Sequence, residues 1–174
     1  YHLLKFANEK QILEKAYNEY SISSLENLVG NVEEKENIAL GKKVNASINN
    51  IPTNPTDNLT DGNKETTWIG ESNVSSFDLT VDLEAESSID GMEISLKQIA
   101  GGFPYTYKVE VFSQNQWIVV AQNDDGEITS QTLIDYKGIA SKVRFTFNTT
   151  DTSIIPEVAE LAIYGKVEKQ PNYK

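Results

Sequence analysis

The chain has 174 residues and no cysteine, with 26 acidic against 15 basic residues and a net charge of −11. This balance argues against nucleic acid or an anionic membrane as a partner, because both bind cationic surfaces. With His2 as the single histidine, a zinc site or a Ser-His-Asp triad is not expected, and no apolar run reaches the roughly 20 residues of a membrane-spanning helix. The composition therefore argues against an enzyme and against membrane insertion.

Apolar residues at helical spacing predict a short helical segment over residues 1–36. They are Leu3, Phe6, Leu13, Tyr17 and Tyr20. The chain begins at Tyr1 without a methionine, and its first residues contain neither an apolar h-region nor a cleavage site of a signal peptide. We interpret residues 1–36 as a linker or as the tail of a preceding domain, in a fragment of a larger protein that lacks its targeting information.

From residue 37 onward the apolar pattern changes to a period of two, which is typical of strands with one buried face. In "FDLTVDLE" the residues Phe77, Leu79, Val81 and Leu83 alternate with polar ones, and similar alternation recurs near residues 92–96, 107–111, 143–147 and 159–163. Turn-rich stretches such as "SQNQ", "NDDGE" and "NTTDT" separate these segments. The pattern predicts antiparallel sheets packed face to face over residues 37–168, followed by a tail at 169–174.

The segment "DNLTDGNKETTW", residues 57–68, concentrates oxygen atoms in front of a large hydrophobic residue. Calcium binds about six to eight oxygens from carboxylates, carbonyls and hydroxyls. Asp61 and Thr66 offer such oxygens, and Gly62 between them allows a tight turn. An ordinary Asp-Gly turn between two strands uses the same residues. The spacing is not that of an EF-hand, and it leaves a calcium site and a simple turn as alternatives.

Six segments resemble one known family in their order and spacing. They are "NIALGKKVNAS" (37–47), "NLTDGNKETTW" (58–68), "FDLTVDLEAESSIDGMEI" (77–94), "YKVEVFSQNQWIVV" (107–120), "SKVRFTF" (141–147) and "AELAIYG" (159–165). The family is the discoidin, or coagulation factor 5/8 type C (F5/8 type C), family, which overlaps the galactose-binding-like carbohydrate-binding modules of family 32. The resemblance implies a mainly β protein: an eight-stranded antiparallel jelly-roll β-sandwich with its first and last strands side by side, after the short N-terminal helical segment.

The resemblance also implies a structural Ca²⁺ as cofactor. Its ligands by motif position are the carbonyls of Leu59, Asn63 and Ala159, the carboxylates of Asp61 and Glu160, and the oxygens of Thr66. Such an ion joins the loop to the last strand, and Trp68 then enters the core as a large anchor. The resemblance further indicates that Trp117 is a core residue and that Arg144 forms a buried or half-buried ion pair.

In the carbohydrate-binding relatives that the chain resembles, the ligand lies in loops at one end of the sandwich. A pyranose ring stacks on an aromatic side chain, while amide and charged groups bind its hydroxyls. The candidate residues are Phe103 and Tyr105 in "IAGGFPYTY", Glu71 and Asn73 in "GESNVSSF", and Asn148 and Asp151 in "NTTDTSIIPE". Phe103 has two alternatives: it is an exposed stacking platform, or it folds back onto the end of the sandwich.

Two functions follow as expectations. The first is a non-catalytic carbohydrate-binding module that binds terminal galactose- or fucose-type sugars. Its parent would be a bacterial glycan-processing protein, such as a glycoside hydrolase, located outside the cell, on its surface or in the periplasm. The second is a structural accessory domain that packs on a neighbouring catalytic domain and binds no ligand. The expected partner is thus a glycan or a neighbouring domain of the same polypeptide, with no nucleic acid and no membrane insertion.

Overall fold

The computed structural model describes residues 35–97, 105–123 and 128–167. In these residues the protein is mainly β, and the prediction of an antiparallel β-sandwich is confirmed. Residues 1–34 of the predicted helical segment (1–36) lie outside the described residues. The predicted tail at 169–174 also lies outside them. Contacts within the chain separate a unit that begins at Glu36 from the residues before it.

Within the described ranges the strands all pair in antiparallel fashion, and two sheets result. The larger sheet has the order β1-β9-β4-β7-β5-β6, with β2 also paired to β4, and the smaller sheet is the pair β3-β8. The elements are β1 (Glu36–Asn37), β2 (Val44–Ala46), the 3-10 helix η1 (Thr56–Leu59), β3 (Trp68–Ile69), β4 (Ser76–Ser95), β5 (Tyr105–Ser113), β6 (Gln116–Asn123), β7 (Gln131–Thr149), β8 (Glu157–Val158) and β9 (Glu160–Val167).

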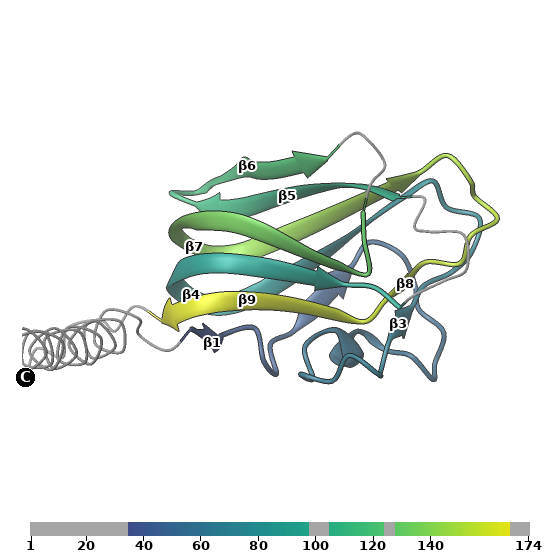
Figure 1. The fold of residues 1–174 in the computed structure, drawn as a ribbon, viewed down its shortest axis with the longest axis horizontal. Helices are drawn as coiled ribbons and strands as arrows, with labels where there is room; N and C mark the ends of the chain where they lie inside the picture. Colours follow the sequence, from purple (N-terminus) through teal and green to yellow (C-terminus); the bar gives the residue numbers. More distant parts are fainter. Residues whose placement is uncertain (1–34, 98–104, 124–127, 168–174) are drawn as a thin grey trace, which may run out of the picture. The chain divides into compact units, whose positions relative to one another are not determined.

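The two longest strands, β4 and β7, belong to both layers of the sandwich. They pair with each other along nearly their whole length, and the register shifts between Asp82 and Ser87 on β4, where both strands curve from one layer into the other (Figure 1). One layer contains β2, the first half of β4, the second half of β7, β5 and β6. The other layer contains β1, β9, the second half of β4 and the first half of β7.

The core lies between these layers, as the alternating pattern predicts. The inward residues of the first half of β4, namely Phe77, Leu79, Val81 and Leu83, are all buried. Aromatic rings fill one part of this core: the ring centroid of Phe77 lies 5.5 Å from that of Trp68, 5.2 Å from that of Phe147 and 5.8 Å from that of Tyr105. The prediction that Trp68 anchors the core is confirmed, since its exposed fraction is 0%.

Two short ladders bring distant parts of the chain together. Glu36 and Asn37 of β1 pair with Gly165 and Tyr164 of β9, so the first and last strands lie side by side, as expected. Trp68 and Ile69 of β3 pair with Val158 and Glu157 of β8. The second ladder holds the end of the oxygen-rich loop next to the start of β9, which is a separation of about 90 residues along the chain.

The outer face of β5, β6 and β7 carries a bidentate ion pair. Arg144 Nε and Nη2 donate to the two carboxylate oxygens of Glu110 at 3.1 and 2.9 Å, and the guanidinium lies 4.1 Å from the centroid of the Trp117 ring. The expected half-buried ion pair of Arg144 is confirmed, with 28% of its side chain exposed. The expectation that Trp117 belongs to the core is wrong, because its ring is half-buried and packs on Phe112 and Arg144.

Replacing Arg144 with Lys is expected to lower the free energy of unfolding by about 1–2 kcal/mol, because an ammonium cannot supply the paired N–H donors or stack on the indole. Urea denaturation measures this change. Lys137→Met is the matched control, since the Lys137 ammonium lies 3.8 Å from Asp90 with 75% of its side chain exposed, and its effect should stay within about 0.5 kcal/mol. Equal effects of the two substitutions would contradict the assignment.

The same ion pair sets a pH dependence. Hydrogen bonds from Arg144 are the main cause that lowers the pKa of Glu110 below 4.5. A carboxyl whose pKa is lowered by folding contributes stability above its unfolded pKa and loses that contribution as the pH falls through the folded value. The difference in unfolding free energy between wild type and Arg144→Lys should therefore shrink in acid, below about pH 4, when the denaturation is repeated there.

Candidate functional site

The oxygen-rich loop runs from the end of η1 to β3, and its two ends are held by hydrogen bonds to neighbouring segments. At its start, the Thr60 hydroxyl donates to the Lys42 carbonyl at 2.8 Å, and the Gly41 amide donates to the Thr60 carbonyl at 2.8 Å. At its end, the Thr67 hydroxyl donates to Glu157 Oε2 at 2.7 Å. Hydrogen bonds from the protein itself therefore hold both ends of the loop in place.

Inside the loop, oxygen atoms gather around Asp61. One oxygen of its carboxylate accepts the Asn63 amide at 2.9 Å, and the other accepts a hydrogen bond from the Thr66 hydroxyl. The Thr66 hydroxyl oxygen also lies 2.9 Å from the Asn63 carbonyl oxygen. Gly62 has a φ of +75°, a left-handed conformation that favours glycine, and it forms the tight turn expected from the sequence.

Glu160, the first residue of β9, faces this loop from the sheet. It is 3% exposed, and its Oε1 accepts the Gly62 amide at 3.3 Å across 98 residues of sequence. Its second oxygen, Oε2, is buried and has no hydrogen-bond partner among the described residues. A buried carboxylate oxygen without a donor destabilises the folded protein unless the carboxyl is protonated or a cation binds to it.

The two carboxyl groups differ in charge state. Burial is the main cause that raises the pKa of Glu160 to about 8, and the neighbouring Asp61 raises it further. Burial alone would also raise the pKa of Asp61, but hydrogen bonds from Thr66 and from the Asn63 amide outweigh it and keep that pKa below 3.8. Asp61 is thus the charged member of the pair at neutral pH, and a cation would stabilise charge on both.

Of the six predicted calcium ligands, hydrogen bonds join Asp61, Asn63 and Thr66 directly, and Glu160 reaches the same loop through the Gly62 amide. Leu59 and Ala159 lie in the adjoining buried backbone, Leu59 at the end of η1 and Ala159 directly before β9. The described residues hold no cluster of three or more His, Cys, Asp and Glu side chains suited to a metal. A cation here would bind two carboxylates together with carbonyl and hydroxyl oxygens, a donor set that fits calcium.

The loops at the other candidate site also lie next to one another. The Asn73 amide donates to the Thr152 carbonyl at 3.1 Å, and the Thr149 amide donates to the Ser75 carbonyl at 2.8 Å. These bonds join the loop after β3 to the loop after β7. Four of the predicted ligand-binding residues are exposed at or beside this junction: Glu71, Asn73, Asn148 and Asp151. Hydrogen bonds from Ser153 lower the pKa of Asp151, which keeps its carboxylate charged.

The two aromatic candidates differ in outcome. Tyr105 is 2% exposed, its ring packs between Phe77 and Phe147, and its hydroxyl donates to the Ile155 carbonyl at 3.4 Å. Burial raises the pKa of Tyr105 to about 12. The expectation that the Tyr105 ring offers a stacking platform is wrong, because the ring is buried in the apolar core. Phe103 lies outside the described residues.

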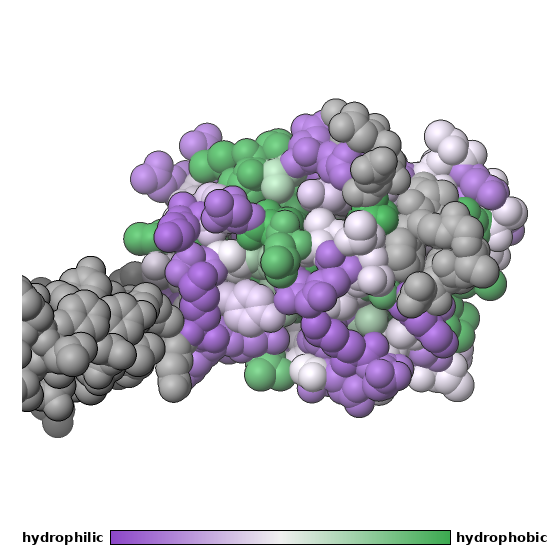
Figure 2. Space-filling view, in the orientation of Figure 1, coloured by the Kyte–Doolittle hydropathy of each residue, from purple (hydrophilic) through white to green (hydrophobic). Residues whose placement is uncertain are grey.

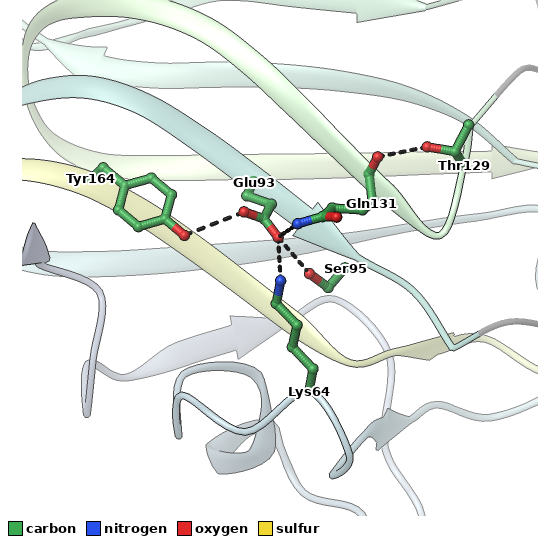
Figure 3. Close-up of polar contacts among 6 residues, drawn as sticks. All are labelled: Lys64, Glu93, Ser95, Thr129, Gln131 and Tyr164. Carbon is green, nitrogen blue, oxygen red and sulfur yellow. Dashed lines mark hydrogen bonds and ion pairs between the residues drawn. The ribbon is translucent and has the colours of Figure 1, made fainter. Parts of the chain in front are cut away.

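The sequence did not single out two further features of these sites. Ile155 is 56% exposed and adds an apolar surface to the loop after β7. Glu93 on β4 is 5% exposed and forms an ion pair with Lys64 of the oxygen-rich loop, with Nζ and Oε1 2.6 Å apart (Figure 3). Alternation along β4 predicts an outward Glu93, but only the three-dimensional fold shows that the loop covers it.

The antiparallel sandwich, with exposed polar loops after β3 and β7 and an oxygen-lined loop against its last strand, has the features expected of the non-catalytic binding modules that the sequence resembles. The chain belongs to the F5/8 type C domain family, whose model matches residues 43–161. Comparison with curated protein sequences found no significant match.

Solved structures agree with this assignment. A family 32 carbohydrate-binding module of a Clostridium perfringens family 89 glycoside hydrolase, solved with GlcNAc-α-1,4-galactose, is 25% identical with a TM-score of 0.67, covering 76% of this chain and 96% of that one. A chitosan-binding module from a Paenibacillus chitosanase/glucanase has a TM-score of 0.66 at 18% identity, covering 76% and 100%. A Ruminococcus gnavus family 29 fucosidase has a TM-score of 0.67 at 23% identity, covering 80% of this chain and 29% of that one.

Among the residues that the structure describes, no helix has the length and apolar character needed to cross a membrane.

Replacing Gly62 with Ala is expected to lower the free energy of unfolding by about 1–2 kcal/mol without added metal, because an L-residue is strained at a φ of +75°. An added Cβ would lie 2.9 Å from the flexible end of the Leu40 side chain, which can move aside. Gly41→Ala is the matched control, with a φ of +71° and no atom within 4 Å of its Cβ. Chemical denaturation should give similar losses for both, and a much larger loss for Gly62 alone would contradict backbone strain as the cause.

Proposed function

We propose that this domain is a carbohydrate-binding module that recognises terminal galactose- or fucose-type sugars through the loops after β3 and β7. The observation that carries the proposal is the likeness to the Clostridium perfringens module, which at 25% identity is solved with GlcNAc-α-1,4-galactose. That likeness covers nearly the whole of the related module.

The chemistry of the loop surface supports this proposal. Glu71 and Asp151 are exposed carboxylates that accept hydrogen bonds from sugar hydroxyls, and Asn73 and Asn148 carry amides that both donate and accept. The exposed Ile155 offers an apolar surface for the C–H face of a pyranose. We take Phe103, a candidate from the sequence, as the aromatic side chain that stacks on the sugar, because Tyr105 is buried.

A glycan array with the full chain tests sugar binding, and titration of a bound galactoside or fucoside then tests the site. Asp151→Asn and Phe103→Ala are each expected to weaken binding by about tenfold or more, because the first removes the negative charge of an acceptor and the second removes a stacking surface. Ile139→Ala is the matched control, since Ile139 is an exposed apolar residue in the middle of β7, whereas these loops adjoin the ends of strands. Sugar binding that the loop variants leave unchanged would place the ligand elsewhere.

We further propose that a calcium ion occupies the loop between η1 and β3. The supporting observation is Glu160 Oε2, a buried carboxylate oxygen without a donor beside the Asp61 carboxylate. The ion would be held by Asp61, Glu160, Thr66 and the carbonyls of Leu59, Asn63 and Ala159. When bound, calcium supplies positive charge to both carboxylates and ties the loop to the last strand, so its role is structural.

Calcium is expected to raise the melting temperature of the wild-type protein, since an ion that binds only the folded state stabilises it. Glu160→Gln should abolish this rise, because it removes a charged ligand while keeping the side-chain shape. Glu84→Gln is the control, since the Glu84 carboxylate is exposed and pairs with Lys42 at 3.4 Å. Thermal unfolding with calcium and with chelator measures the effect, and a wild-type protein indifferent to calcium would refute the site.

The structure also supports a second candidate, an accessory domain that packs on a neighbouring domain of the same polypeptide. Apolar surface lies over β6 and β7 on the face shown in Figure 2, and the exposed apolar residues of these strands include Ile118, Val119 and Leu133, the last with 73% exposure. In the Ruminococcus gnavus fucosidase the matching region is 29% of the chain, so such domains occur within larger enzymes. A glycan array without any bound sugar would favour this candidate.

Both candidates belong to a secreted or surface-attached bacterial glycan-processing protein. The similar modules of Clostridium perfringens and Paenibacillus come from bacterial glycoside hydrolases. We therefore propose a catalytic domain of this kind as the neighbour of the present domain.

A further inference from the structure

A buried polar cluster lies beneath the oxygen-rich loop, on the side of β4 that faces away from the core. Its centre is Glu93, which stands between the core residues Met92 and Ile94 and is 5% exposed. Figure 3 shows the donors that converge on its carboxylate. They are Lys64 Nζ at 2.6 Å, Gln131 Nε2 at 2.7 Å, the Ser95 hydroxyl at 3.1 Å and the Tyr164 hydroxyl at 3.3 Å.

These donors come from four different parts of the fold. Ser95 belongs to β4, Gln131 to β7 and Tyr164 to β9, so Glu93 is held rigidly within the second layer of the sandwich. Lys64 is the exception, because it belongs to the loop and keeps 52% of its side chain exposed. The Lys64–Glu93 ion pair is therefore a connection between the loop and the sheet.

The position of this connection relates it to the proposed calcium ligands. Lys64 follows Asn63 directly and precedes Thr66 by two residues. Glu93 lies two residues before Ser95, which is the register partner of Glu160 and whose carbonyl accepts the Ala159 amide at 2.9 Å. The ion pair thus joins the loop that carries one set of proposed ligands to the strand that aligns the other set.

We infer that Lys64 and Glu93 are positioning residues of the proposed calcium site, holding the Asp61–Thr66 loop at the separation from Glu160 that a bridging ion requires. Because the loop is already placed, little ordering remains to oppose binding, and affinity is higher. This inference rests on the proposed calcium site.

Removal of Lys64 separates positioning from simple electrostatics, because the two effects have opposite signs. An ammonium close to a cation site repels calcium, so electrostatics alone predicts that Lys64→Met binds calcium equally well or more tightly. Positioning predicts weaker binding, since the loop loses its connection to β4. Lys64→Met should leave the protein folded, because over half of the Lys64 side chain is in solvent and three other donors remain on Glu93.

The experiment is a calorimetric calcium titration of the full chain, with ion-free melting temperatures recorded for each variant. Lys64→Met is expected to weaken calcium binding by about tenfold, the lower end of the effect seen for residues that orient metal ligands. Lys64→Arg should retain most of the affinity because it restores the ion pair. Lys137→Met, which removes an exposed lysine paired with Asp90 at 3.8 Å, should leave affinity unchanged. Equal or tighter binding by Lys64→Met would overturn the inference.

Glu93→Gln completes the test as a double-mutant cycle with Lys64→Met. If the two residues act through their mutual contact, the double variant should bind calcium no more weakly than the weaker single variant. Additive losses would overturn a joint role. A wild-type protein that binds no calcium refutes the calcium site and this inference with it, whereas wild-type binding that both variants retain refutes the positioning role alone.

Discussion

The pairing of β4 with β7 is the constraint on which the rest of the structure depends. Both strands pass from one layer of the sandwich into the other, and their contact continues on both sides of the bend between Asp82 and Ser87. The other strands of the large sheet attach to this pair or to its neighbours: β5 joins β7, while β2 and β9 join β4. The core residues of the two halves of β4 therefore face the same interior from opposite layers.

Both candidate sites are produced by segments that this frame brings together. The ladder of β3 with β8 places the oxygen-rich loop against the start of β9, where a charged Asp61 meets the buried Glu160. The loops after β3 and β7 meet through Asn73 and Thr152. The segment from Trp68 to Asn73 thus connects the two candidate sites: it leaves the oxygen-rich loop and enters the candidate ligand-binding loops.

The sequence predicted the strands well, because a strand with one solvent-exposed and one buried face has apolar residues at every second position. Phe77, Leu79 and Val81 follow this pattern and are buried. The calcium ligands are predicted through the family motif, since spacing alone cannot tell an ion site from an Asp-Gly turn, and they stay a prediction. Tyr105 was misjudged because a strand residue beside a glycine-rich stretch looks like loop, and Trp117 because an outward ring on a sheet has the same alternation as an inward one. The Glu93 cluster gave no local signal, because it is made by contacts across several strands and a loop.

The pairing of β1 with β9 has a consequence for how the domain is attached to a longer chain. Antiparallel partners such as Asn37 and Tyr164 lie about 5 Å apart, so the polypeptide enters and leaves the sandwich at almost one point. In Figure 1 this point is at the opposite end from the loops after β3 and β7. The loops proposed to bind sugar therefore lie away from the point where the chain enters and leaves the sandwich. Rejoining the two ends and opening a loop elsewhere should likewise yield a circular permutant that keeps the same fold.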